Sequence, residues 1–212
     1  MGTLIVIYGL PGTGKTTISK KIKEKFRDKC ERLYTRHYEG DFKNDRDSKE
    51  YFEAKEHAYN NLFDRAKDSM KTIPLVVVEG TFTDIGGGTT GQERLESYIT
   101  LAEEENYQPL LLGISCSDEK TTANRLIERK KLNPKSRGSL KEYRILIPAF
   151  NINLTHPNNI EIDNNASLKE LNEILEKEVY HRIYLNGDAI PSIDCELSTE
   201  MIARKMYRTM KG

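Results

Sequence analysis

The sequence has few cysteines, no excess of either charge and no long apolar run. Its 212 residues include three cysteines, Cys30, Cys116 and Cys195, an odd number at wide spacing. This pattern argues against a disulfide framework and against a cysteine metal site, and it favours free thiols in a reducing cytosol. We therefore expect a cytoplasmic protein in which each cysteine is a small, buried apolar residue.

Three further absences limit the classes of function that the sequence allows. Lysine plus arginine equals aspartate plus glutamate, 33 each, so no global positive charge indicates nucleic-acid binding. A local basic groove stays open, and with it a nucleic acid as substrate only. No stretch is long enough to cross a bilayer, which predicts no membrane partner. Residues 1–8 lack a basic segment and form the first predicted strand, so we expect no signal peptide.

The most specific pattern in the chain lies near its amino end. A predicted buried strand at residues 4–8 is followed by G-x-x-x-x-G-K-T, which begins at Gly9 and ends at Thr16, and then by a predicted helix. This is the phosphate-binding P-loop pattern. A tight strand-to-helix turn with an exposed lysine is the alternative, and the order of strand, loop and helix argues against it.

The residue types of this loop suit a nucleoside triphosphate. Gly9, Gly12 and Gly14 permit positive φ angles and a close approach of backbone N–H groups to phosphates. The helix that begins near Gly14 directs its partial positive charge at the same phosphates. Lys15 is predicted to reach the β and γ phosphates, and the Thr16 hydroxyl to hold Mg²⁺. The residues of the loop predicted to bind the nucleotide are Gly9, Pro11, Gly12, Thr13, Gly14, Lys15, Thr16 and Thr17.

Predicted strands and helices alternate along the rest of the chain. Further strands are expected at 31–38, 74–80, 108–116 and 159–163. Helices are expected at 14–27, 48–70, 90–102, 117–131, 139–150 and 167–179, with a last one from about residue 198. Capping-box patterns begin three of these helices, at Thr90, Ser139 and Ser167. The alternation predicts an α/β fold with a parallel sheet and right-handed crossovers.

Three later segments join the P-loop in a recognisable order: Val78-Glu79-Gly80-Thr81, then Asn124-Arg125-Leu126-Ile127-Glu128-Arg129, then a strand ending Ile160-Glu161-Ile162-Asp163. The set resembles the small P-loop kinases, the nucleoside- and adenylate-kinase-like group that includes polynucleotide 5′-hydroxyl kinases and zeta-toxin-type kinases. The resemblance covers residues 1–180. It implies a three-layer P-loop NTPase sandwich with a five-stranded parallel sheet in the order 2-3-1-4-5. It also implies a helical lid at about 130–150, and residues 181–212 are expected to form an extension packed on the same domain.

The resemblance implies ATP or another nucleoside triphosphate as phosphoryl donor, together with Mg²⁺. Arg125 is expected to pack on the donor base and Arg129 to contact phosphates, since their spacing places both on one helical face. A solvated basic helix end is the alternative for this pair. Arg137, in the basic segment 131–139, is a candidate for an arginine that closes over the γ-phosphate.

A kinase also needs a group that accepts or orients the proton of the acceptor hydroxyl. In the resembling family this is usually an aspartate just after the second strand. Asp41 is the candidate here, and Asp45 and Asp47 are its rivals. Glu79 ends the third strand, beside the P-loop if strands 1 and 3 are neighbours. It is a candidate for holding a magnesium-bound water or the acceptor.

The acceptor itself stays open, because the sequence departs from its relatives on that side. Phe82-Thr83-Asp84 follows E-G-T without the nearby arginine that zeta-toxin-type kinases use for a nucleotide sugar. After the second strand, Arg46 does not stand at the position that the Asp-x-x-Arg pattern of polynucleotide kinases requires after Asp41.

The sequence therefore predicts Mg²⁺-dependent transfer of the γ-phosphoryl group of ATP to a hydroxyl on a small molecule, a nucleotide or a nucleic-acid end. The predicted catalytic residues are Lys15, Asp41, Arg129 and Arg137, and the predicted metal residues are Thr16 and Glu79. A nucleotide-binding switch that acts through a partner is the alternative, but the N-K-x-D and D-x-x-G patterns it needs are missing after the relevant strands. For residues 181–212, a homodimer contact and an extra layer over the core are both open.

Overall fold

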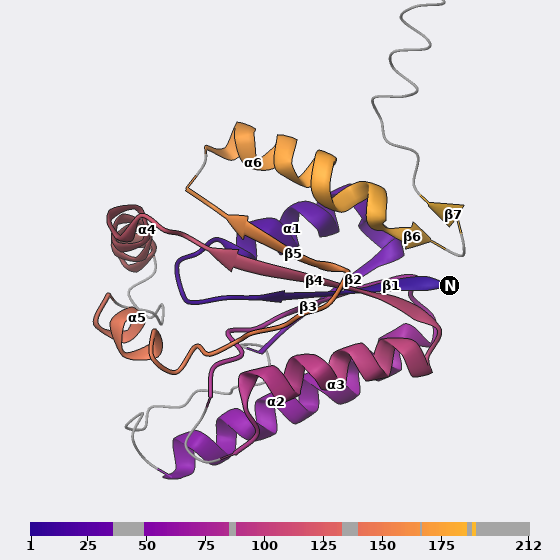
Figure 1. The fold of residues 1–212 in the computed structure, drawn as a ribbon, viewed down its shortest axis with the longest axis horizontal. Coiled ribbons are helices and arrows are strands. Elements are labelled where there is room, and N and C mark those ends of the chain that lie inside the picture. The colour runs from indigo at the N-terminus through magenta and orange to yellow at the C-terminus, as the bar shows by residue number, and fades with distance from the viewer. Residues whose placement is uncertain (36–48, 85–87, 133–139, 166, 186–187, 190–212) are drawn as a thin grey trace, which may run out of the picture.

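A five-stranded parallel sheet forms the centre of the protein (Figure 1). The computed structural model describes residues 1–35, 49–84, 88–132, 140–165, 167–185 and 188–189. The strands are β1 (Gly2–Tyr8), β2 (Cys30–Tyr34), β3 (Leu75–Glu79), β4 (Tyr107–Ser115) and β5 (Asn159–Asp163). Their order is β2-β3-β1-β4-β5, which confirms the predicted topology. Because β1 is central, the loop that follows it is flanked by the ends of β3 and β4.

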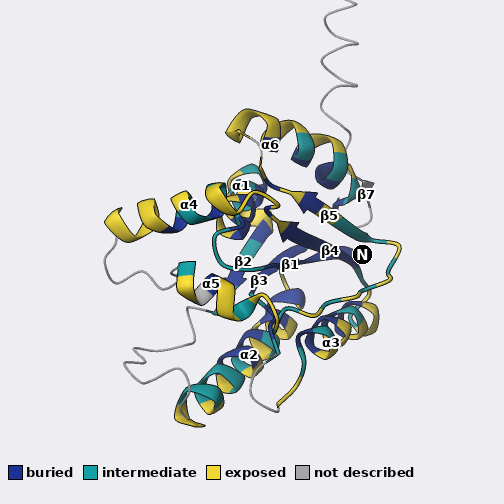
Figure 2. Cartoon of the chain, turned by 60° about the vertical axis from the view of Figure 1, so that its left-hand side comes forward, coloured by how far each residue is buried: buried dark blue, intermediate teal, exposed yellow. Residues whose placement is uncertain are grey.

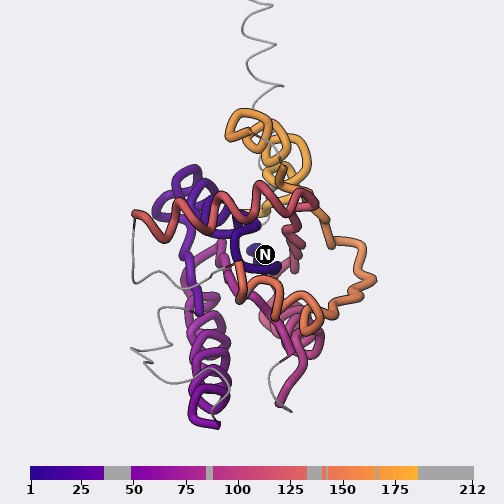
Figure 3. Tube along the Cα trace, turned by 90° about the vertical axis from the view of Figure 1, so that its left-hand side faces the viewer, coloured from indigo at the N-terminus to yellow at the C-terminus, as the bar shows by residue number. Residues whose placement is uncertain are grey.

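Helices cover both faces of the sheet, so the fold has three layers (Figure 1). The longer helices are α1 (Lys15–Phe26), α2 (Lys49–Met70), α3 (Gly91–Glu104) and α4 (Glu119–Leu132), and the shorter ones are α5 (Leu140–Leu146) and α6 (Leu168–Ile174). α1 and α6 lie on one face and α2 and α3 on the other, whereas α4 and α5 lie at the edge where the strands end (Figure 3). Short turns continue α1 and α6, namely η1 (Arg27–Lys29), η3 (Leu175–Val179) and η4 (Tyr180–Arg182), and a two-stranded pair follows, β6 (Tyr184–Leu185) and β7 (Asp188–Ala189).

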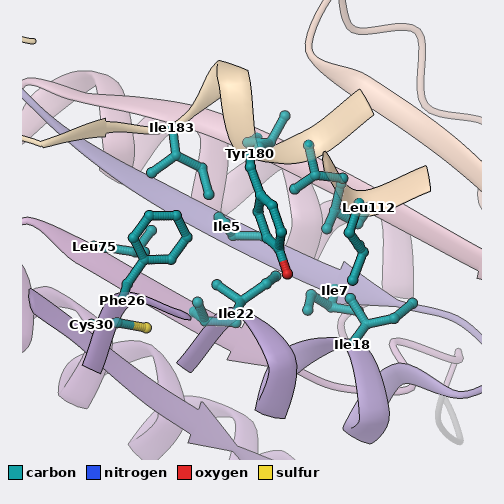
Figure 4. Close-up of a cluster of buried hydrophobic side chains, with 14 of the residues drawn as sticks. Ile5, Ile7, Ile18, Ile22, Phe26, Cys30, Leu75, Leu112, Tyr180 and Ile183 are labelled. Atoms are coloured by element: carbon teal, nitrogen blue, oxygen red, sulfur yellow. The ribbon is translucent and has the colours of Figure 1, made fainter. Parts of the chain in front are cut away.

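Strand β1 is buried along its whole length because it contributes to two cores (Figure 2). Leu4 and Val6 pack among side chains of α2 and α3, and Ile5 and Ile7 pack among side chains of α1 and the segment after α6. Figure 4 shows the second core, where the ring of Phe26 meets Tyr180 edge to face at 5.7 Å. A fully buried aliphatic side chain contributes about 1.5–3 kcal/mol, so β1 anchors the loop that follows it firmly.

Most predicted boundaries agree with the structure to within one or two residues, with two corrections. β2 ends at Tyr34, so the prediction that it extends to residue 38 is wrong. Tyr34 pairs with Glu79, the last residue of β3, and among the described strands β2 has no other neighbour in the sheet. The predicted helix at 139–150 ends at Leu146.

Several predicted features lie outside the described residues. These are the candidates Asp41, Asp45, Asp47 and Arg137, Cys195, the capping residue Ser139 and the helix expected from residue 198. Earlier in the chain, Ile183 is buried in the second core, and the main-chain N–H of Tyr184 donates to the hydroxyl of Thr3 at 2.8 Å. Cys30 and Cys116 are both buried free thiols. No described helix is both long and apolar enough to cross a membrane.

Two of the predicted capping boxes are confirmed, at the starts of α3 and α6. At α3, the Thr90 hydroxyl accepts a hydrogen bond from the Glu93 N–H at 3.1 Å, and the Glu93 carboxylate accepts one from the Thr90 N–H at 2.7 Å. These reciprocal bonds satisfy main-chain donors that the first turn of a helix cannot pair. The first residue of this helix, Gly91, lies close to the main-chain carbonyl of Phe82.

We expect Thr90→Ala to lower the free energy of unfolding by about 1 kcal/mol, since the hydroxyl that caps α3 is lost. Urea unfolding followed by circular dichroism measures this change. Thr100→Ala is a matched control, because Thr100 is exposed within the same helix and alanine has the higher helix propensity there. Equal destabilisation by both variants would show that the cap is not the cause.

Candidate active site

The P-loop lies at the carboxyl ends of the parallel strands, between the last residue of β1 and the start of α1 (Figure 3). Gly9, Gly12 and Gly14 have φ angles of 142°, 84° and 103°, as the pattern predicts. At Gly9 the constraint is also steric, because a Cβ atom there would lie 2.1 Å from the carbonyl oxygen of Ile114 on β4. A side chain at this position would push the loop off the end of the sheet.

Lys15 is the first residue of α1 and is almost fully buried. Its Nζ atom donates to the carbonyl oxygens of Gly9 and Leu10, both at 2.7 Å, and so spans the loop. Burial lowers the pKa of Lys15 to about 8; the nearby carboxylate of Glu79 opposes this shift, and the positive charge of Arg129 adds to it. The surroundings of Lys15 therefore compensate its positive charge only in part, and a negatively charged phosphate would add to that compensation.

Glu79, at the end of β3, is the hub of a buried hydrogen-bond network. Its Oε1 atom accepts a hydrogen bond from the Thr16 hydroxyl. Its Oε2 atom accepts from Ser19 Oγ at 2.7 Å and from Arg32 Nη2 at 2.8 Å. The second arm of the Arg32 guanidinium, Nε, donates to Ser19 Oγ at 2.6 Å. Burial opposes the ionisation of Glu79, but the bonds from Thr16, Ser19 and Arg32 outweigh it and hold the pKa of Glu79 below its usual value.

The residues at this position fit a bound Mg²⁺. Mg²⁺ prefers oxygen ligands, keeps several waters, and is usually bound by one or two carboxylates together with substrate phosphates. Thr16 and Glu79 bring one hydroxyl and one carboxylate together beside the phosphate loop. Within the described residues, no group of three or more histidine, cysteine, aspartate or glutamate side chains forms a richer metal site. Thr16 and Glu79 are thus the pair predicted from the sequence to hold the metal.

The two arginines of α4 lie in different surroundings. Arg125 is half-buried, and its Nη1 atom donates to the main-chain oxygen of Asn164 at 2.8 Å. Arg129 is exposed and lies one turn further along, and its positive charge contributes to the lowered pKa of Lys15. The tip of the P-loop touches the same helix, since a Cβ atom on Gly12 would lie 3.0 Å from Thr122. The helix that carries both arginines therefore packs directly on the loop.

Three residues of the site were missed by the sequence reasoning: Ser19, Arg32 and Asn164. A signal existed for Ser19, because it follows Thr16 by three positions on a helix and so shares its face. Arg32 is a charged residue inside a short strand, and the sequence does not show that its guanidinium turns toward Glu79. Asn164 follows β5 directly, but its contact with the P-loop joins residues 151 positions apart.

Comparison with known proteins agrees with this geometry. A family model described as an AAA domain matches residues 4–143, which is well over half of the chain. The chain belongs to this AAA domain family. The matched region of the AAA domain begins in β1, contains the P-loop and Glu79, and extends past both arginines of α4. A search of curated proteins found no match.

Solved structures that share the fold of this AAA domain include P-loop kinases. A candidate kinase from Chloroflexus aurantiacus J-10-fl has a TM-score of 0.57 at 15% identity, over 84% of this chain and 98% of that one. Kti12 from Chaetomium thermophilum, in complex with ADP-AlF3, has a TM-score of 0.51 at 12% identity, over 82% and 96%. Shikimate kinase from Acinetobacter baumannii, in complex with shikimate, has a TM-score of 0.50 at 16% identity, over 84% and 96%. The resemblance to the small P-loop kinases is confirmed, and at these identities it establishes the fold.

The lowered pKa of Lys15 leads to a prediction about proton uptake. Near pH 9, above its pKa of about 8, Lys15 is mostly neutral in the free protein, whereas polyphosphate bound beside it would raise the pKa and restore the charge. We expect ATP binding near pH 9 to take up part of a proton at Lys15. Calorimetric titrations in two buffers of different ionisation enthalpy measure the uptake.

Lys15→Arg is the matched control, because a guanidinium does not titrate in this range. We expect the uptake near pH 9 to disappear in this variant, and the two proteins to differ little near pH 6.5. The same uptake in both proteins near pH 9 would contradict the assignment to Lys15.

Proposed function

We propose that this protein transfers the γ-phosphoryl group of ATP to a hydroxyl group of an acceptor, in a Mg²⁺-dependent reaction. The observation that carries the proposal is the pairing of an intact P-loop with Glu79, through the hydrogen bond from Thr16, in a kinase fold. Kti12 in complex with ADP-AlF3 and shikimate kinase in complex with shikimate support it, since one fold combines a nucleotide site with a site for a hydroxylated acceptor.

The donor side of the reaction is built from groups with defined tasks. The loop amides and the start of α1 bind the polyphosphate. Lys15 exchanges its bonds to the carbonyls of Gly9 and Leu10 for bonds to phosphate oxygens. Thr16 and Glu79 would hold Mg²⁺, which would neutralise part of the phosphate charge. Positioning and charge stabilisation, rather than covalent chemistry, carry the rate of such a transfer.

The acceptor side rests on residues named from the sequence. Asp41 is proposed to accept or orient the proton of the acceptor hydroxyl, and Arg137 to contact the γ-phosphate. Arg129 is proposed to stabilise the charge that develops during transfer, which its effect on Lys15 supports. The class of acceptor stays as wide as a small molecule, a nucleotide or a nucleic-acid end.

We expect Lys15→Ala to lower the rate of phosphoryl transfer at least about 100-fold, because a preorganised donor of this kind contributes that much to the transition state. Transfer of label from γ-labelled ATP to a panel of hydroxyl acceptors measures the rate, and a thermal melt tests whether the fold persists. Lys20→Ala is the control, since Lys20 is exposed on the same helix. Unchanged transfer in Lys15→Ala would contradict the proposed role, and an unfolded variant would contradict the view that Lys15 is kept for charge.

We expect Asp41→Asn to lower kcat far more than it weakens ATP binding, because the proposed role of Asp41 begins only at the transfer step. Comparison of kcat with the ATP affinity from calorimetry separates the two effects. An unchanged kcat would remove Asp41 from the site. Hydrolysis that no acceptor accelerates, with no label moved to an acceptor, would favour the switch hypothesis over the kinase.

A further inference from the structure

Asn164 connects the end of β5 to the P-loop. It is 3% exposed, and its main-chain N–H donates to the carbonyl of Ser115 at the end of β4, at 2.9 Å. Its side-chain Nδ2 atom donates to the carbonyl oxygen of Thr13 at 2.8 Å. A buried amide anchored to two strand ends therefore holds one carbonyl of the phosphate loop.

This bond fixes the direction of the peptide between Thr13 and Gly14. No described peptide bond is cis, and in a trans peptide the C=O and N–H groups point in opposite directions. Since the Thr13 carbonyl points at Asn164, the Gly14 N–H points away from it. Gly14 also permits the approach, because its φ is 103° and a Cβ atom would lie 2.1 Å from Asn164 Nδ2.

A glycine beside this peptide makes the anchor necessary. Glycine adopts many backbone conformations at little cost, so the peptide could turn over easily if nothing held it. Turned over, it would present a carbonyl oxygen, with partial negative charge, where a P-loop presents N–H groups to phosphate. Thr13 anchors its own hydroxyl to the carbonyl of Leu10 at 2.9 Å, and Asn164 anchors its carbonyl.

Helix α4 supports the same residue from the other side. Arg125 on α4 donates to the main-chain oxygen of Asn164 at 2.8 Å. The backbone of Asn164 is thus held by β4 through Ser115 and by α4 through Arg125, while its side chain is directed at Thr13.

We propose that Asn164 is a positioning residue for donor binding, whose side-chain amide keeps the Gly14 N–H turned toward the polyphosphate. The inference rests on the proposed function, since it assumes that the loop binds a nucleotide. We expect Asn164 to affect the binding of the second and third phosphates, because P-loop amides surround the β and γ groups rather than the base.

The test compares ADP with AMP in titrations of wild type and Asn164→Ala followed by ¹⁵N–¹H NMR spectra. We expect ADP to bind the variant about 10-fold more weakly and AMP to change less than about 2-fold, because the variant weakens one charge-assisted hydrogen bond to the second phosphate. In wild type, ADP should move the Gly14 amide proton downfield, as a bond to a charged oxygen does, and Asn164→Ala should reduce this shift.

Asn165→Ala is the matched control. Asn165 is the next residue, but its amide donates to Ser117 at 2.6 Å and to Asp163 at 2.8 Å instead of to the loop. This variant should keep the wild-type ratio of ADP to AMP affinity and the Gly14 shift. Asn164→Ser serves in the same comparison should Asn164→Ala fail to fold.

The outcomes separate this inference from the function on which it rests. If wild type binds ADP and the Asn164 variants keep both the affinity ratio and the Gly14 shift, the positioning role is overturned and the proposed function stands. Equal weakening of ADP and AMP would also overturn it, since that result indicates general damage to the pocket. If wild type binds neither nucleotide, the proposed function falls and this inference with it.

Discussion

The ionised carboxylate of Glu79 is the group on which the geometry of the site depends. Removing a carboxylate from water costs several kcal/mol, which only well-placed hydrogen bonds and an opposite charge can offset. Thr16, Ser19 and Arg32 provide these bonds, from α1 and from β2. Because the loss of any partner would leave a buried charge poorly compensated, the network fixes the start of α1 relative to the ends of β2 and β3. The P-loop lies between these fixed points.

Local charge, rather than net charge, suits the site to a polyanion. The formal net charge of the chain is zero. Around the loop, however, Arg32 already compensates Glu79, and the buried ammonium of Lys15 is bonded only to the carbonyl oxygens of Gly9 and Leu10. The same compensation leaves little negative charge to attract free Mg²⁺, so any Mg²⁺ held by Thr16 and Glu79 would be bound together with the phosphates that share its coordination.

The sequence was sufficient for features that depend on short segments. The P-loop pattern, the capping boxes at Thr90 and Ser167, and the strand order implied by the family resemblance all agree with the structure. It failed at the end of β2, because the ladder stops where β3 stops, at Glu79, and no local pattern in β2 records the length of its neighbour.

The roles of Arg32 and Asn164 could not be predicted from the sequence for a related reason. Each acts through a contact with a residue that is distant along the chain: Arg32 with Glu79, and Asn164 with Thr13. Side-chain direction at both positions is set by tertiary packing, so neither residue type alone indicates its partner. Ser19 differs, because helical spacing from Thr16 predicts at least the face on which it lies.

The sheet itself explains why the donor side is so much better defined than the acceptor side. In a parallel sheet the carboxyl ends of all strands meet at one edge. Here the end of β3 supplies Glu79, the end of β4 contacts Gly9 through Ile114, and the residue after β5 holds Thr13. Contacts from β3, β4 and the residue after β5 thus fix the loop that follows β1 and leave the backbone of that loop little conformational freedom. The segments assigned to the acceptor follow β2, at the sheet edge, and α4, outside the sheet. None of the three anchoring contacts comes from those segments, so the fold that fixes the phosphate site does not by itself define the acceptor.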